Sequence, residues 1–199
     1  MASKAHAVLS ASSSDRWLHC PPSARLCETY KDKGSDYAAE GTDAHSLCEF
    51  KLRKALGQSV KGPTENLNFY NEEMEDCAAG YAAYVIEQVE AAKETCPDPV
   101  VLVEQRVDFS RWVKQGFGTA DCLIIADGTL RVFDFKYGLG VLVSAEENPQ
   151  MKCYALGALE LFDDIYDIDD VTLHIYQPRR QNVSEWRIPK ADLLTWAEE

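Results

Sequence analysis

The chain has 199 residues, which is the size of one ordinary domain. Its hydrophobic fraction of 46% and charged fraction of 27% are typical of globular proteins and exclude a disordered or collagen-like chain. The net charge of −13 argues against a protein that coats nucleic acid non-specifically, because such binding depends on lysine and arginine side chains that neutralise phosphates.

Helical patterns dominate the first half of the chain. Capping residues and apolar spacings of three and four predict helices at about 12–20, 42–56 and 71–94, with a loop at 31–37. We expect Thr42 or Asp43 near the cap of the second helix and Asn71 at the cap of the third.

The second half is rich in strands. β-Branched and aromatic runs predict strands at 100–107, 117–126, 129–137, 171–176 and 185–188, with a helix from Asn148 to about Phe162. The segment from Lys190 begins like a helix and has no stop signal, so we expect one domain over 1–199 that lacks a C-terminal continuation. The element order predicts an α/β fold in which a mixed central sheet, an antiparallel meander plus further strands, carries helices on both faces.

We expect a cytoplasmic protein with no membrane partner. No apolar run approaches the ~20 residues that a membrane span needs, and the N-terminal segment does not resemble a secretory signal. The seven cysteines are scattered and never spaced C-x-x-C, which favours reduced thiols over a disulfide framework.

Two aspartates are predicted to face each other across a hairpin. Asp127-Gly128 between two strand-like runs is a strong signal for a two-residue turn. With that turn, Asp121 lies directly opposite Asp134, with Cβ atoms ~5 Å apart. Lys136 then projects from the same face, because it lies two residues beyond Asp134.

Opposed carboxylates repel each other, so the pair needs a compensating charge. A divalent cation would supply it, and the alternative is an exposed hairpin face with a lysine–aspartate surface pair. Glu104 interrupts an otherwise apolar strand and needs a partner, either the same cation or a salt bridge with Arg106 or Lys136.

These residues, in this order, resemble the PD-(D/E)XK nuclease superfamily, and most closely its RecB-type branch, which includes CRISPR-associated exonucleases and related phage proteins. The resemblance implies a restriction-endonuclease-like core. The matching elements are Ser14 six residues before Cys20-Pro21, Gly41-x-x-x-His45, Asp121, Asp134-Phe135-Lys136 and Gln150-x-x-x-Tyr154.

The resemblance also implies roles for single residues. His45, Asp121, Asp134 and the backbone carbonyl of Phe135 would bind one or two Mg²⁺ or Mn²⁺ ions. Lys136 would orient or deprotonate the attacking water. The candidate catalytic residues are thus Asp121, Asp134, Lys136 and Glu104, and Gln150 and Tyr154 would contact the DNA strand or support Lys136.

Two features near the N-terminus belong to this comparison. Many relatives bind a 4Fe–4S cluster through one early and three late cysteines; Cys20 occupies the first place, but no cysteine follows Cys153, so we expect no cluster. Arg16 and Trp17 are candidates to grip and stack on a DNA strand, although for Trp17 burial as a core anchor is the favoured interpretation.

The sequence therefore predicts a metal-dependent DNA exonuclease that hydrolyses phosphodiester bonds. Its expected partners are DNA, as single strands or duplex ends, and proteins of phage or recombination systems. One alternative is a catalytically inactive nuclease-fold module that serves as a scaffold in DNA processing by phages or mobile elements. Another is a metal-dependent hydrolase of small phosphorylated molecules.

Overall fold

The computed structural model describes residues 7–29 and 34–199. The described helices are α1 (Ser14–His19), α2 (Pro22–Glu28), α3 (Asp36–Ala55), α4 (Glu72–Lys93), α5 (Pro149–Tyr166) and α6 (Lys190–Glu198). The described strands are β1 (Val100–Asp108), β2 (Phe117–Ala126), β3 (Thr129–Phe135), β4 (Asp170–Gln177) and β5 (Asn182–Pro189).

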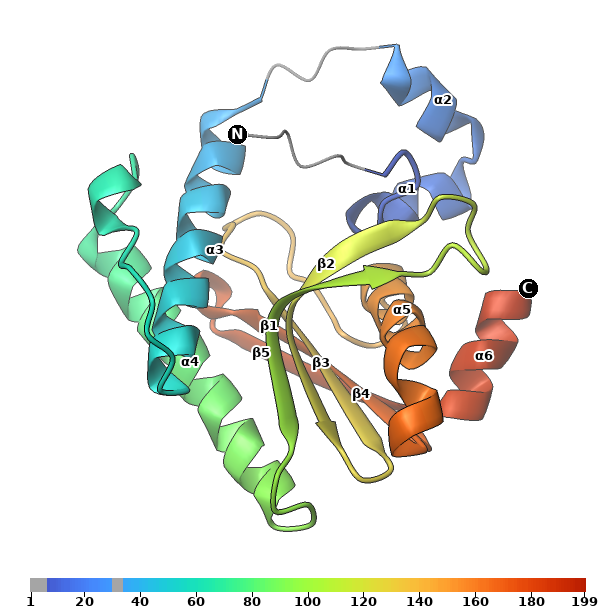
Figure 1. Ribbon diagram of the computed structural model, residues 1–199. Helices are drawn as coiled ribbons and strands as arrows, with labels where there is room; N and C mark the ends of the chain where they lie inside the picture. Colours follow the sequence, from blue (N-terminus) through green and yellow to red (C-terminus); the bar gives the residue numbers. More distant parts are fainter. Residues whose placement is uncertain (1–6, 30–33) are drawn as a thin grey trace.

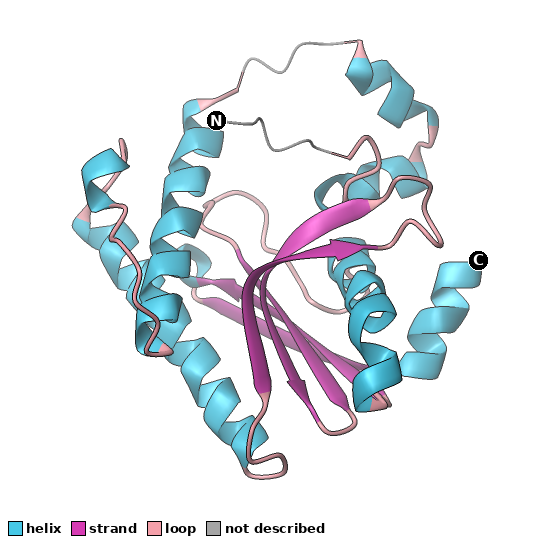
Figure 2. Ribbon diagram, in the orientation of Figure 1, coloured by secondary structure: helices cyan, strands magenta, loops and turns pink. Residues whose placement is uncertain are grey.

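The strands form one sheet in the order β1-β2-β3-β4-β5. The β3–β4 pair is parallel and the other neighbours are antiparallel, because α5 provides the crossover that parallel strands require. Helices α3 and α4 pack on one face of the sheet and α5 on the other, with α6 beside α5 (Figures 1 and 2). This confirms the predicted mixed α/β sheet with helices on both faces.

Helix α3 begins earlier than the sequence predicted. Ser35 caps it, since its Oγ accepts a hydrogen bond from Ala38 N at 3.1 Å, and the helix runs from Asp36 through Gly41. The first turns carry exposed side chains and lack the apolar spacing that marks a buried helix face, which explains the loop prediction at 31–37. Only residues 34–37 of that predicted loop lie within the described part of the chain, and two of them are helical.

The predicted caps of the two long helices after α3 are confirmed. Asn71 Oδ1 accepts from Met74 N at 2.8 Å at the start of α4. Asn148 Oδ1 accepts from Met151 N at 3.2 Å, with Pro149 at the first position of α5. These side chains satisfy N–H groups that the helix leaves without backbone partners.

Strands β1 and β2 bend sharply where Glu104 lies opposite Asp121 (Figure 1). Glu104 has a φ of +54°, in the left-handed region that costs a residue with a side chain ~1–2 kcal/mol. The pairing register is the same on both sides of the bend. The strand pair therefore turns without inserting a residue.

At the bend, the side chains of both strands also change the side of the sheet to which they point. In a regular strand, residues two or four positions apart point to the same side. Val103 and Cys122 pack in the apolar cluster under α3 and α4, but Val107 and Ala120 pack in the cluster under α5. The acidic residues at positions 104 and 121 thus lie where the sheet passes from one layer of helices to the other.

Lys152 joins the C-terminal helix to the core. Its side chain is 2% exposed and pairs with Glu147. Its Nζ lies 4.7 Å from the ring centre of Trp196 on α6 and 5.3 Å from that of Trp186 on β5. These cation–π contacts link three elements, α5, β5 and α6.

A buried histidine lies on the opposite side of the sheet, under α4. His174 is 1% exposed, stacks on Phe133 at a centroid distance of 4.4 Å, and has its Nδ1 2.8 Å from Tyr84 Oη. Glu185 Oε2 lies 3.6 Å from the same nitrogen. Burial, with a smaller effect of Arg131, lowers the pKa of His174 to about 3, so the ring is neutral at pH 7.

No helix in the described residues is long and apolar enough to cross a membrane.

Candidate metal centre and active site

The hairpin register is the one that the Asp-Gly turn predicted. Ala126 pairs with Thr129 across the turn, and Gly128 has the positive φ of +71° that the turn requires. The ladder continues to Cys122–Phe133, so the next positions are Asp121 and Asp134. Both aspartates therefore lie at the same end of the β2–β3 hairpin, next to the bend.

Three residues from separate elements converge at the bend. His45 comes from α3, Glu104 from β1 and Asp121 from β2, and one potential ligand atom of each lies within 4.8 Å of the others. His45 Nδ1 is 3.1 Å from Asp121 Oδ1, and Phe135 packs edge-on against the imidazole ring at 5.5 Å. The predicted ligands His45 and Asp121 are thus brought together, and Glu104 takes the third place in the cluster.

Asp134 lies beside the cluster and contacts α5. Its Oδ1 accepts from Gln150 Nε2 at 2.8 Å, and its Oδ2 lies 3.0 Å from Lys136 Nζ. Lys136 Nζ also donates to Gln150 Oε1 at 2.9 Å. The Gln150 amide lies 3.1 Å from Tyr154 Oη as well, so residues 134, 136, 150 and 154 form one connected polar group.

Glycine at position 118 allows Tyr154 to approach this group. A Cβ added there would lie 2.6 Å from the Tyr154 ring, closer than real Cβ contacts come. The tyrosine ring is therefore packed directly on the β2 backbone, which fixes its hydroxyl near Gln150.

The charges of these groups depend on one another. Burial raises the pKa of the Asp134 carboxyl; Lys136 opposes this effect and Asp121 adds to it, and the net pKa is raised. Burial acts in the same direction on Asp121, but His45 and the Phe135 N–H, 2.6 Å from Oδ2, outweigh it and lower its pKa. Burial would lower the pKa of His45, but the neighbouring carboxylates, Asp121 foremost, raise it to about 9. The neighbouring carboxylates therefore raise the affinity of this site for protons and cations.

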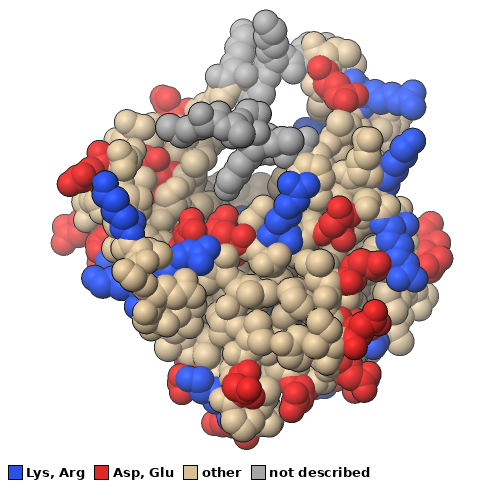
Figure 3. Space-filling model, in the orientation of Figure 1, with Lys and Arg blue, Asp and Glu red and all other residues tan. Residues whose placement is uncertain are grey.

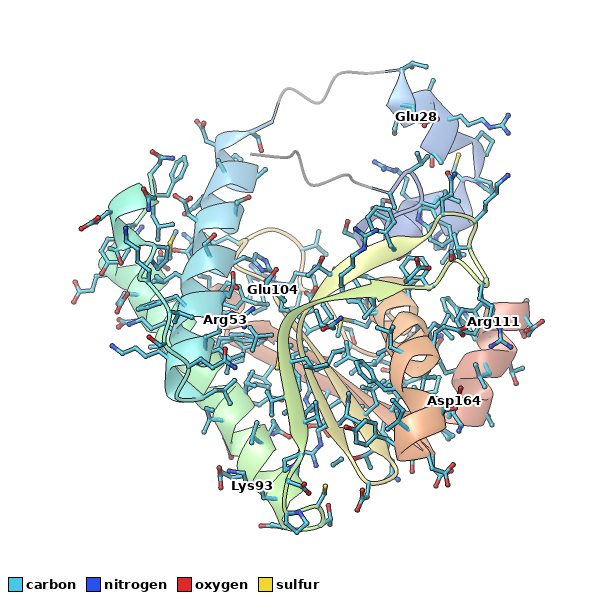
Figure 4. The ribbon with its side chains drawn as sticks, viewed as in Figure 1. Glu28, Arg53, Lys93, Glu104, Arg111 and Asp164 are labelled. Atoms are coloured by element: carbon cyan, nitrogen blue, oxygen red, sulfur yellow. The ribbon has the colours of Figure 1, made fainter. Side chains whose placement is uncertain are left out.

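Arg53 supports the unusual conformation of Glu104. Its Nη2 donates to the carbonyl of Val103 at 2.9 Å, and its Nε donates to Glu49 Oε1 at 2.8 Å. The hydrogen bond to Val103 fixes the peptide immediately before Glu104. Figure 4 labels Arg53 on α3 and Glu104 on the adjacent strand.

Sequence reasoning missed Arg53, although a signal was present. The residues His45, Glu49 and Arg53 are spaced by four and so lie along one face of a helix. The ligand candidate His45 therefore indicated which other α3 residues reach the sheet.

The donor set fits a divalent cation. An imidazole nitrogen with two or three carboxylates suits Mn²⁺ and, with more water ligands, Mg²⁺. The buried Asp134 Oδ2 accepts no hydrogen bond of regular geometry from the described residues. His45 keeps 37% of its side chain exposed, so a cation can reach the cluster from solvent.

The N-terminal site residues do not join this cluster. Trp17 is 8% exposed, packs in the core under α5, and donates from Nε1 to Ser10 O at 3.0 Å. Because the ring is almost fully buried, the structure favours the core-anchor alternative over the stacking role. Arg16 and Cys20 are exposed on and just after α1, and no site residue is among their described contacts.

The fold and the site define an α/β protein with a histidine–carboxylate cluster next to a lysine and a glutamine. The chain belongs to the family described as "Protein of unknown function (DUF2800)", which it matches over residues 6–199. It is also similar to a solved structure entitled "Crystal structure of SSO0001", with 14% identity and a TM-score of 0.26. That match covers 76% of this chain and 82% of the other.

Proposed function

We propose that the protein is a metal-dependent DNA exonuclease of the PD-(D/E)XK type that hydrolyses phosphodiester bonds. The observation that carries this proposal is the convergence of His45, Glu104 and Asp121 beside the Asp134–Lys136–Gln150 group. The hairpin register and the helix α5 contacts support it, since they bring together residues that lie far apart in the sequence.

His45, Glu104, Asp121 and Asp134 would hold the Mg²⁺ or Mn²⁺ ion. When bound, the ion polarises the scissile phosphate and acidifies a water molecule. The carboxylates would hold the ion at the bend, where His45 is open to solvent.

Lys136 supplies a fixed positive charge next to these ligands. Asp134 and Gln150 hold its ammonium group through the 3.0 Å and 2.9 Å contacts, so the charge does not need to be reorganised when substrate arrives. It is suited to stabilise charge that develops on the phosphate and to orient the attacking water. Gln150 and Tyr154 hold Lys136 and Asp134 in place.

The surface charge supports action on a strand end more than on long duplexes. On the face shown in Figure 3, basic side chains are scattered among acidic ones and form no continuous basic surface. Phosphate contacts on this face are therefore expected to be few, with a small gain in affinity from counterion release there.

The direct test is degradation of labelled linear single-stranded and duplex DNA in Mn²⁺, with Lys136→Ala as the test variant. Lys93→Ala is the matched control, since Lys93 is an exposed residue at the far end of α4 (Figure 4). We expect wild type and Lys93→Ala to shorten DNA from its ends, and Lys136→Ala to be slower by about 100-fold or more. Equal activity of Lys136→Ala and wild type would refute the proposed site. Binding of DNA without cleavage by wild type would favour the inactive scaffold module instead.

A further inference from the structure

A cavity of about 410 Å³ opens next to the metal cluster. It lies between the start of α3, with Tyr37 and Gly41, and the loop after β3, with Tyr137 and Leu139. Figure 1 shows this loop beside the upper part of α3. The volume falls in the range of ~300–1,000 Å³ that is typical of small-ligand sites.

This cavity is continuous with the catalytic cluster. A neighbouring cavity of about 350 Å³ is lined by His45, Lys136 and the same loop. The two cavities share Gly41, Tyr137 and two loop glycines as lining residues. A phosphate beside Lys136 would therefore place the rest of its nucleotide at the entrance of the larger cavity.

Tyr137 lies in the wall between the two cavities, but its ring is 3% exposed because Phe135 and Arg179 pack against it. The planar groups open to the larger cavity are therefore Arg179 and the exposed Tyr37. Tyr137 stacks on Phe135 at 6.2 Å with an interplanar angle of 27°. The Arg179 guanidinium lies over the Tyr137 ring, 4.6 Å from its centre, and lines the larger cavity. Glu40 and Glu73 pair with Arg179 at 3.4 Å and 3.2 Å, so the guanidinium is fixed and its charge is neutralised. It offers a planar surface rather than a free charge for a phosphate.

The rim of these cavities exposes large hydrophobic side chains. Tyr37 is 86% exposed, Leu139 53% and Val141 83%. Neighbouring exposed apolar groups at a cavity mouth are typical of a binding surface.

We propose that the larger cavity binds an unpaired nucleobase of the nucleotide next to the scissile phosphate, which makes the substrate single-stranded nucleic acid. This inference rests on the proposed function. Bases stack on exposed aromatic rings such as Tyr37 and on guanidinium planes such as that of Arg179, and such stacking does not need a net positive charge. A base in a closed duplex is already stacked and paired on both sides, so it cannot enter the cavity.

Gly41 allows a specific test. A Cβ at this position would meet no other heavy atom within 4 Å, and Gly41 lies inside α3. Gly41→Ala therefore adds no clash and is the matched control, whereas Gly41→Leu extends a larger side chain into the junction of the two cavities. Both substitutions favour the helix, so loss of folding does not confuse the result.

The measurement is fluorescence anisotropy of a labelled single-stranded oligothymidylate, with Ca²⁺ present so that cleavage does not interfere. Comparison probes are an abasic oligonucleotide of equal length and a hairpin duplex. Wild type and Gly41→Ala should bind oligothymidylate about tenfold more tightly than either comparison probe, and Gly41→Leu should lose this preference. Mn²⁺ affinity measured by calorimetry should be equal in all three proteins.

Equal affinity of wild type for the base-containing and abasic strands would overturn the inference, as would full retention of the preference by Gly41→Leu. These binding results are independent of cleavage. Base-dependent binding without hydrolysis would refute the exonuclease proposal and leave the nucleobase site intact. Hydrolysis of DNA without base-dependent binding would refute the nucleobase site and leave the exonuclease proposal intact.

Discussion

Replacing Glu104 by glycine and by alanine should separate its structural cost from its role in the site. Both substitutions remove the carboxylate, but they differ in how they tolerate the backbone φ of +54°. Alanine pays ~1–2 kcal/mol in the left-handed region, whereas glycine adopts it freely. Glycine in turn loses ~0.5–1 kcal/mol through its greater freedom in the unfolded chain.

The balance predicts that Glu104→Gly is more stable than Glu104→Ala by ~0–1.5 kcal/mol. The adjacent Gln105 provides the control pair, since it lies in the same strand and is not among the residues with positive φ. At that position the order should reverse, with alanine more stable than glycine by ~0.5–1 kcal/mol.

Urea unfolding of the four variants gives these differences, and calorimetric titration with Mn²⁺ gives the effect on metal binding. Both Glu104 variants should lose Mn²⁺ affinity to the same extent, while both Gln105 variants retain it. If the difference in stability between the glycine and alanine variants is the same at position 104 as at position 105, the left-handed conformation of Glu104 is wrong. The geometry of the metal cluster would then be refuted with it.

Three other substitutions test the surroundings of the site and the core. Arg53→Met keeps the aliphatic stem but removes the donor to Val103 O, so Mn²⁺ affinity should fall about tenfold in calorimetry. An unchanged affinity would show that Arg53 does not position Glu104. Lys152→Ala should lower the free energy of unfolding by ~2–3 kcal/mol in urea, because it removes both the buried stem and the cation–π contacts; a loss below ~0.5 kcal/mol would contradict their importance. His174 has a pKa of about 3 in the fold and 6.5 in the unfolded chain, so the unfolded chain binds the proton more readily. The free energy of unfolding should therefore fall as the pH drops below 6.5, by ~2 kcal/mol at pH 5. His174→Phe should flatten this part of the pH–stability curve, and identical slopes for both proteins would show that His174 does not determine it.

The parts of the fold that were predicted correctly depend on local interactions. The Asp127-Gly128 turn fixes the hairpin register through its own backbone geometry, and the register places Asp121 and Asp134 at one end of the sheet. Asn71 and Asn148 cap their helices through bonds that span three residues.

The features that sequence reasoning did not predict depend on tertiary contacts. The exposed first turns of α3 have no apolar pattern, so only the Ser35 cap marks the start of this helix. Glu104 was predicted as a site residue, but its left-handed conformation was not, because it depends on a bend between two layers of helices with Arg53 bound to the preceding carbonyl. The choice between burial and stacking for Trp17, which the sequence left open, depends on its packing in the core under α5.

The binding of a divalent cation at the bend is the central claim, and anomalous diffraction from crystals grown with Mn²⁺ tests it most directly. We predict an anomalous peak within coordination distance, about 2.0–2.3 Å, of His45, Glu104 and Asp121 ligand atoms. A map with no peak between these three side chains at saturating Mn²⁺ would contradict the metal centre and the hydrolytic function proposed from it.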